Sequence, residues 1–138
     1  MNLQDCVEKG YLIKEKVSKD LIIKEFNESD YDLASAKNAV EGLDYKWAII
    51  KCYYSMFHAA KAICFSLGYR EKKHIALLIM LEELNKQGKL EQEFLNFFRA
   101  AIDSREGADY QYTYSAEIAQ HNLKIAVLFN SRMKRLNV

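Results

Sequence analysis

The chain of 138 residues has no proline and only five glycines. Proline breaks helices because it lacks a backbone N–H and clashes with the preceding turn, so nothing of this kind interrupts a long helix here. The apolar residues form no uninterrupted run of membrane-spanning length. The first residues show no basic stretch followed by an apolar block, so we expect no secretory signal, no membrane association and a cytoplasmic location.

Cysteine is also scarce, with Cys6, Cys52 and Cys64 as the only three. Cys52 and Cys64 are expected on one helix, about 18 Å apart at ~1.5 Å per residue, which is too far for a disulfide. No cysteine or histidine spacing is typical of zinc, so we predict reduced core thiols, no metal and no cofactor. The formal net charge of +1 argues against a broad, nonspecific nucleic-acid surface but leaves room for a local basic patch.

Hydrophobic residues, in contrast, make up 50% of the chain, and its length suits one domain over residues 1–138. Their spacing is helical in almost every segment. The expected helices cover residues 3–9, 18–41, 44–67, 74–86, 90–105 and 115–136. The short connections between them predict an all-α fold, an antiparallel up-and-down bundle of four to six helices.

Residues 105–114, Arg-Glu-Gly-Ala-Asp-Tyr-Gln-Tyr-Thr-Tyr, lie between two of these expected helices. If Gly107 ends the first helix, the Arg105 guanidinium and the free N–H groups at the start of the next helix would meet at one loop and bind phosphate. The alternative is that Arg105 pairs with Asp103 or Asp109 and serves only structure.

The same segment carries three alternating tyrosines, Tyr110, Tyr112 and Tyr114. In an extended loop their side chains would project to one side, where they could stack on bases or pack against a second copy of the chain. The alternative is that they close the end of the bundle.

A second candidate surface is a basic and aromatic stripe, Lys51, Tyr54, His58 and Lys61, on the helix expected over residues 44–67. Such a stripe could face phosphate or a stacked base, or it could be a solvated face or a dimer surface. His74 begins the following helix after several charged residues, where free backbone N–H groups favour an anion, although a surface loop of mixed charge explains it equally well.

Three features occur in order along the chain: a tyrosine pair on the expected central helix, a glycine followed by a histidine, and an Arg-x-x-x-Asp-Tyr string. They are Tyr53 and Tyr54, Gly68 and His74, and Arg105, Asp109 and Tyr110. In this combination the chain resembles the small prokaryotic HEPN (higher eukaryotes and prokaryotes nucleotide-binding) proteins over about residues 10–135. The resemblance implies a HEPN-like helical bundle, a homodimer, and a minimal nucleotidyltransferase as partner, often encoded beside it as a toxin–antitoxin-like pair.

The resemblance also implies site residues. Active HEPN ribonucleases carry Arg-x4-6-His, and one toxin branch carries Arg-x4-His-x-Tyr, with the arginine and histidine of two protomers meeting across the dimer. Arg105 matches the arginine and Tyr112 the final tyrosine, the expected acceptor of AMP from the partner, but Tyr110 stands at the histidine position. A phenol with a reference pKa of about 10 is a poor base at neutral pH, whereas histidine at about 6.5 is well suited.

The sequence therefore favours a dimeric HEPN protein that engages RNA or nucleotide through Arg105, Asp109 and Tyr110, without enzymatic activity. One alternative is a weak or atypical metal-independent endoribonuclease, in which His58 or His74 substitutes for the missing base. Another assigns the tyrosine-rich segment to dimerisation alone.

Overall fold

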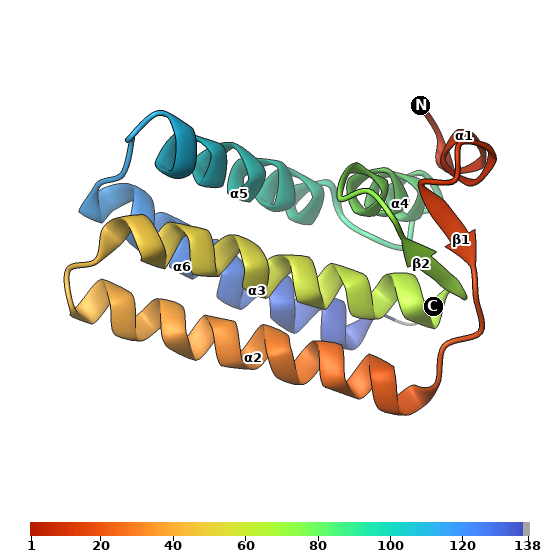
Figure 1. Cartoon of the computed structure of the whole chain (residues 1–138), viewed down its shortest axis with the longest axis horizontal. Coiled ribbons are helices and arrows are strands. Elements are labelled where there is room, and N and C mark those ends of the chain that lie inside the picture. The colour runs from red at the N-terminus through yellow and green to blue at the C-terminus, as the bar shows by residue number, and fades with distance from the viewer. Residues whose placement is uncertain (137–138) are drawn as a thin grey trace.

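Four long helices run alternately up and down along one axis, and the smaller elements gather at one end of the bundle (Figure 1). The computed structural model describes residues 1–136. Its elements are α1 (Leu3–Glu8), β1 (Leu12–Lys14), α2 (Lys19–Glu41), α3 (Tyr45–Ser66), β2 (Tyr69–Glu71), α4 (Ile75–Lys86), α5 (Gln92–Tyr110) and α6 (Ala116–Arg135). The predicted all-α bundle is confirmed, and none of the described helices is long and apolar enough to cross a membrane.

The central element is α3, which packs against α2, α5 and α6. Fourteen of its 22 residues are buried. A helix enclosed on most sides has no continuous polar face, and this explains why its sequence is apolar or aromatic at most positions. The rings of Phe98 on α5 and Phe129 on α6 stack with their centroids 5.4 Å apart and join these two helices.

The three cysteines are buried free thiols, as the sequence predicts. Burial raises the pKa of Cys52 and of Cys64 to about 12. A thiol with so high a pKa carries almost no thiolate at neutral pH, and the thiolate is the reactive form. These side chains therefore act as small apolar groups in the core.

The end of α5 differs from the sequence prediction. The helix was expected to stop at Arg105 with Gly107 as its cap, but it continues to Tyr110. Glycine inside a helix costs only about 1 kcal/mol relative to alanine. The next residue, Ala108, is fully buried against the bundle, and this packing holds the additional turn in place. Gly107 still contributes to the end of α5, because its carbonyl accepts hydrogen bonds from the N–H groups of Gln111 and Thr113, which follow the last helical residue.

A two-stranded antiparallel sheet, absent from the sequence prediction, joins the segment before α2 to the segment after α3. Gly68 allows the chain to turn from α3 directly into β2. Its φ of +85° is a conformation that other residues rarely adopt. The paired residues are Leu12 with Glu71, Ile13 with Arg70 and Lys14 with Tyr69. Strands of three residues are too short for their alternation to be recognised in a sequence.

A buried polar cluster, which we call the serine clamp, connects three of the long helices. Ser29 Oγ on α2 donates to the carbonyl of Ser55 on α3, and Ser55 Oγ donates to the carbonyl of Ser29, both at 2.7 Å. Asn130 Nδ2 on α6 donates to Ser55 Oγ, also at 2.7 Å. These polar groups are buried and have no access to water, so the hydrogen bonds between them take the place of the hydrogen bonds that water would otherwise make. The clamp therefore fixes the register of α2 and α6 against α3.

Replacing Ser55 by alanine is expected to lower the free energy of unfolding by about 2 kcal/mol, because the buried Asn130 amide loses its acceptor. Ser66→Ala, on the same helix, is the control: Ser66 is exposed and bonds only within α3, so its removal should stay within about 0.5 kcal/mol. Urea unfolding followed by circular dichroism measures both. Equal midpoints for the two variants would show that the clamp contributes nothing to stability.

Candidate functional site

Arg105 lies more than one turn before the end of α5, and its side chain reaches towards α3. Its Nη2 donates to the phenol oxygen of Tyr54 at 3.3 Å. The guanidinium carbon lies 5.2 Å from the ring centroid of Tyr53 and 5.6 Å from that of Tyr54. Both separations are within the range of cation–π attraction, so the planar group packs against one side of this ring pair, whose centroids are 5.1 Å apart. The tyrosine pair of α3 therefore forms a support for the arginine.

Asp109 lies one turn after Arg105 on the same helix, and its Oδ2 is 3.3 Å from Arg105 Nε. The two atoms are close enough for an ion pair but are not aligned as a hydrogen bond, so the buried Nε has no hydrogen-bond partner among residues 1–136. Arginine carries five N–H donors, and an unused buried donor is unfavourable. The buried Nε is closed to a ligand, but Nη1 makes no hydrogen bond among residues 1–136 and can donate to an anion.

His74 comes from the start of α4 and approaches the same tyrosine pair. Its Nδ1 lies 3.1 Å from the phenol oxygen of Tyr53, and its ring centroid is 4.4 Å from that of Phe57. Burial lowers the pKa of His74, the neighbouring Glu71 carboxylate opposes this effect, and the Arg105 cation adds to it. The imidazole is therefore neutral at physiological pH, with one ring nitrogen able to accept a proton.

These side chains surround a hollow of about 190 Å³, which we call the Arg105 pocket. It is lined by Tyr53, His74, Ile75, Ile102, Arg105 and Glu106. A fixed cation, a neutral imidazole, a phenol and a carboxylate thus meet where α3, α4 and α5 converge. This combination can bind a phosphate group and move a proton beside it.

Sequence reasoning selected Arg105 and His74 separately, named Tyr53 only as part of the tyrosine pair behind the family resemblance and missed Glu106. A signal for Glu106 exists, because Ile102, Arg105 and Glu106 stand at positions i, i+3 and i+4 and so share one face of a helix. That face was hidden when the helix was expected to end at the arginine. The tyrosine pair marks Tyr53 in the sequence, but its contacts with His74 and Arg105 depend on residues of other helices and are not visible there.

The stripe of Lys51, Tyr54, His58 and Lys61 does not form one surface. Tyr54 contacts Arg105, whereas His58 faces α2, where its Nδ1 lies 2.7 Å from Glu25 Oε2. The hydrogen bond that His58 donates to the Glu25 carboxylate raises the pKa of His58, against the opposing effect of burial. Lys61 Nζ lies 3.8 Å from the same Glu25 carboxylate. His58 is therefore engaged in an ion-paired cluster between α2 and α3, separate from the Arg105 pocket.

The three tyrosines after Arg105 are exposed: 70% of Tyr110, 79% of Tyr112 and 44% of Tyr114 is accessible. They neither close the bundle nor follow one extended loop, because Tyr110 is helical and Tyr112 has a left-handed φ of +54°. The free N–H groups of α6 do not meet the guanidinium either. Ser115 Oγ accepts from the N–H of Ile118 and caps that helix. The expected meeting of arginine and helix start at one loop is therefore wrong, because α5 continues for another turn.

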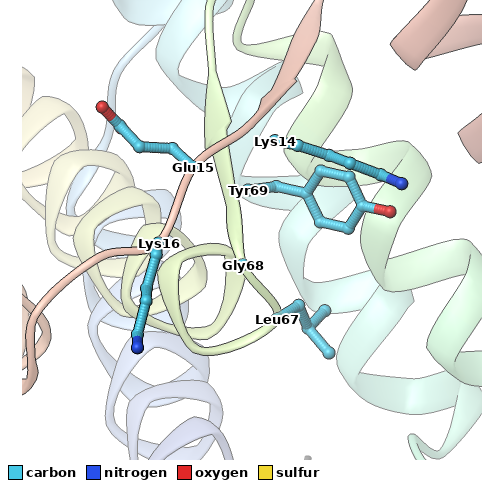
Figure 2. A pocket seen from close by; sticks show the side chains of 6 residues that line it. All are labelled: Lys14, Glu15, Lys16, Leu67, Gly68 and Tyr69. Atoms are coloured by element: carbon cyan, nitrogen blue, oxygen red, sulfur yellow. The ribbon is translucent and has the colours of Figure 1, made fainter.

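A larger hollow, of about 400 Å³, lies between β1 and the turn from α3 into β2. Figure 2 shows Lys14 and the ring of Tyr69 side by side, while Glu15 and Lys16 extend in other directions. The charged groups of Lys14, Glu15 and Lys16 in the lining of this hollow therefore do not converge on one point. No group of three or more histidine, cysteine, aspartate or glutamate side chains within residues 1–136 is arranged to hold a metal ion. The Arg105 pocket is thus the better candidate despite its smaller volume.

The HEPN domain family matches residues 24–136. A Methanocaldococcus jannaschii protein named "Putative toxin" is 28% identical over 115 residues, which are 81% of this chain and 78% of that protein. A UPF0332 protein of Archaeoglobus fulgidus is 31% identical over 101 residues, 72% of this chain and 81% of that protein.

A crystal structure of a protein from Thermus thermophilus has the same fold, with a TM-score of 0.71 at 14% sequence identity. The alignment covers 82% of this chain and 95% of that one. At this level of identity the likeness concerns the arrangement of helices alone. The family match extends from within α2 to the end of α6 and so includes the four long helices of the observed bundle. This chain therefore belongs to the HEPN domain family.

Proposed function

We propose that this protein is a toxin-like HEPN homodimer that binds RNA or nucleotide through a phosphate group at the Arg105 pocket. It works with a minimal nucleotidyltransferase in a toxin–antitoxin-like two-gene system. The observation that carries the proposal is the Arg105 guanidinium, which packs against the tyrosine pair and whose Nη1 makes no hydrogen bond among residues 1–136. A second Methanocaldococcus jannaschii relative named "Putative toxin", 29% identical over 110 residues, adds support for the toxin-like role.

The chemistry of the pocket suits a phosphate oxygen. A guanidinium stays charged at every physiological pH and presents a planar fork of donors that matches phosphate geometry. The rings of Tyr53 and Tyr54 restrict its motion and exclude water from one side, which strengthens its attraction for an anion. Asp109 balances part of the positive charge and holds the side chain in place while the pocket is empty.

Loss of the guanidinium is expected to weaken RNA binding. Arg105→Ala should lower the affinity for a fluorescent single-stranded RNA of randomised sequence by about tenfold or more, since a charge-assisted contact is worth about 1.5–3 kcal/mol. Arg105→Lys should give an intermediate loss, because it keeps the charge without the fork. Fluorescence anisotropy measures the dissociation constants.

Arg99→Ala is the matched control, since Arg99 lies on the same helix and forms an exposed pair with Glu82. It removes the same charge and should change the affinity by less than about twofold. If Arg99→Ala and Arg105→Ala bind RNA equally well, the Arg105 pocket is not the phosphate site and the proposal fails.

The proposed dimer would use the end of the bundle that carries the turns α2–α3 and α5–α6, which lie together at the left of Figure 1. Large apolar side chains are exposed there: Leu43, Trp47, Tyr110 and Tyr112. Exposed apolar groups that gather in one region favour association with a partner, and a second copy provides the same surface. Arg105 lies on α5 near this end.

Light scattering is expected to give twice the mass of the 16.1 kDa chain. Leu43→Asp should shift the protein towards the monomer by placing a charge in the interface, and aspartate tolerates the φ of +63° at this position. Tyr31→Asp is the control, since Tyr31 and Leu43 are both 71% exposed but Tyr31 lies along α2. A wild-type monomer at micromolar concentration would disprove the dimer.

Tyr112 is the proposed acceptor of AMP from the nucleotidyltransferase. It has the most exposed phenol of the three neighbouring tyrosines, so its hydroxyl can reach the α-phosphate of a nucleotide held by another protein. Co-expression with the transferase encoded beside it should add the mass of AMP to the wild type and to Tyr114→Phe, but not to Tyr112→Phe. Intact mass spectrometry decides, and AMP that persists on Tyr112→Phe would assign the site to another residue.

A further inference from the structure

We propose that a groove between α2 and α6 docks an acidic amphipathic helix of a partner protein. The apolar side chains of that helix would lie in the groove, and its carboxylates would pair with the lysines at the sides of the groove. The surface lies away from the Arg105 pocket and from the end of the bundle at which the dimer is proposed. Docking there therefore requires neither of them.

The α2–α6 groove has a volume of about 340 Å³, which is within the range of binding sites in proteins. It is lined by one residue of α2, Lys37, and by five residues of α6: Gln120, Leu123, Lys124, Val127 and Leu128. Val127 is 41% exposed and Leu128 is 45% exposed. Covering these adjacent aliphatic side chains would remove apolar surface from water and so stabilise a complex.

The charged groups of the groove are all of one sign. Lys37 and Lys124 are its only charged lining residues, and both are exposed. Neither lysine takes part in an ion pair within residues 1–136. An apolar floor with unpaired ammonium groups at its sides is complementary to an apolar segment that carries carboxylates.

The same seam between α2 and α6 shows this pairing at another point. Lys134 Nζ of α6 lies 2.6 Å from Asp30 Oδ1 of α2. Lys37 follows Asp30 by seven residues, which is about two turns, so the two residues lie on one side of α2. No carboxylate lines the groove beside Lys37. A partner's carboxylate would supply there what Asp30 supplies to Lys134.

A second copy of the chain fits this groove poorly. A two-fold dimer brings the same surface of both protomers together. The lysines of both protomers would then share one seam, with no carboxylate among the lining residues. Like charges brought together in an interface disfavour association. The occupant is therefore a different protein, and its docking segment carries negative charge.

The shape of the groove favours a helix as this segment. The lining residues of α6 follow helical spacing from Gln120 through Lys124 to Leu128, and they cover about two turns, or about 12 Å, of one helix face. A helix laid along such a face contacts it with its residues i, i+3, i+4 and i+7. Because Lys37 stands on α2 and Lys124 on α6, carboxylates on either flank of this apolar ridge would reach a lysine.

The groove and the Arg105 pocket lie on different sides of the bundle. In Figure 1, α2 runs along the bottom of the bundle and α5 along the top. The groove is formed by α2 and α6, whereas the pocket lies where α3, α4 and α5 converge. A helix docked in the groove therefore leaves the Arg105 pocket open.

The probe for this surface is a fluorescein-labelled peptide of about 15 residues, with leucine at i, i+3, i+4 and i+7 and glutamate on both flanks. Fluorescence anisotropy should show saturable binding to the wild type, with a dissociation constant of about 100 μM or lower. A second peptide, in which lysine replaces each glutamate, should bind at least about fivefold more weakly because the lysines of the groove repel it.

A change in the apolar part of the groove tests its contribution. Leu128→Glu should weaken binding of the glutamate peptide by about tenfold or more, because it places a carboxylate against the leucine ridge. The side chain is exposed and glutamate is a good helix former, so the variant should fold. Leu43→Asp, at the proposed dimer end, is the control and should bind the peptide like the wild type.

Reversal of the charge tests the complementarity itself. Lys37→Glu combined with Lys124→Glu should invert the preference, so that the lysine peptide binds more tightly than the glutamate peptide. The matched control combines Lys19→Glu with Lys24→Glu, which changes the net charge equally at exposed positions of α2 outside the groove. This control should retain the preference of the wild type. Circular dichroism checks that each variant is folded.

Absence of saturable binding by the wild type, equal affinity for the two peptides, or the same preference in both double variants would overturn the inference. Self-association that light scattering detects in the wild type and that Leu128→Glu abolishes would also overturn it, because the groove would then hold a second copy. The tests of RNA binding and of the proposed dimer use other residues, so each of these results leaves the Arg105 pocket as it stands.

Discussion

The enclosure of α3 is the constraint on which the rest of the structure depends. With 14 of 22 residues buried, this helix can place few polar groups, and each of them must find a partner within the protein. The Ser55 hydroxyl meets Ser29 and Asn130, and the Tyr53 phenol meets His74. The polar contacts of α3 therefore decide how α2, α4, α5 and α6 are set around it.

The candidate site follows from the same packing. Tyr53 and Tyr54 of α3 both contact Arg105 of α5, and Tyr53 also contacts His74 of α4, so that Arg105 and His74 line the same pocket. Each group changes the others electrostatically. The cation and the burial of the imidazole lower the pKa of His74, and Asp109 limits the uncompensated charge of the arginine. A cation and a neutral imidazole are thus combined in one small pocket.

Much of the bundle is visible in the sequence, since long amphipathic helices repeat their apolar residues and end at recognisable residues such as Gly68. The error at Gly107 shows the limit of such local signals. Glycine there favoured a helix end, but the burial of Ala108 against other helices outweighed a cost of about 1 kcal/mol. One misplaced end also misplaced the candidate site, because it put Arg105 at the last position of a helix instead of within its body.

The sequence by itself determined the helical class and the thiols of the core, because these depend on composition and periodicity, and its order along the chain singled out Arg105 as a candidate. Only the tertiary structure decided which histidine approaches the arginine. His58 and His74 are equally plausible in the sequence, but packing pairs the first with Glu25 on α2 and the second with Tyr53 beside the pocket. Protonation follows from these neighbours, which are distant in sequence, and so no local pattern could have assigned it.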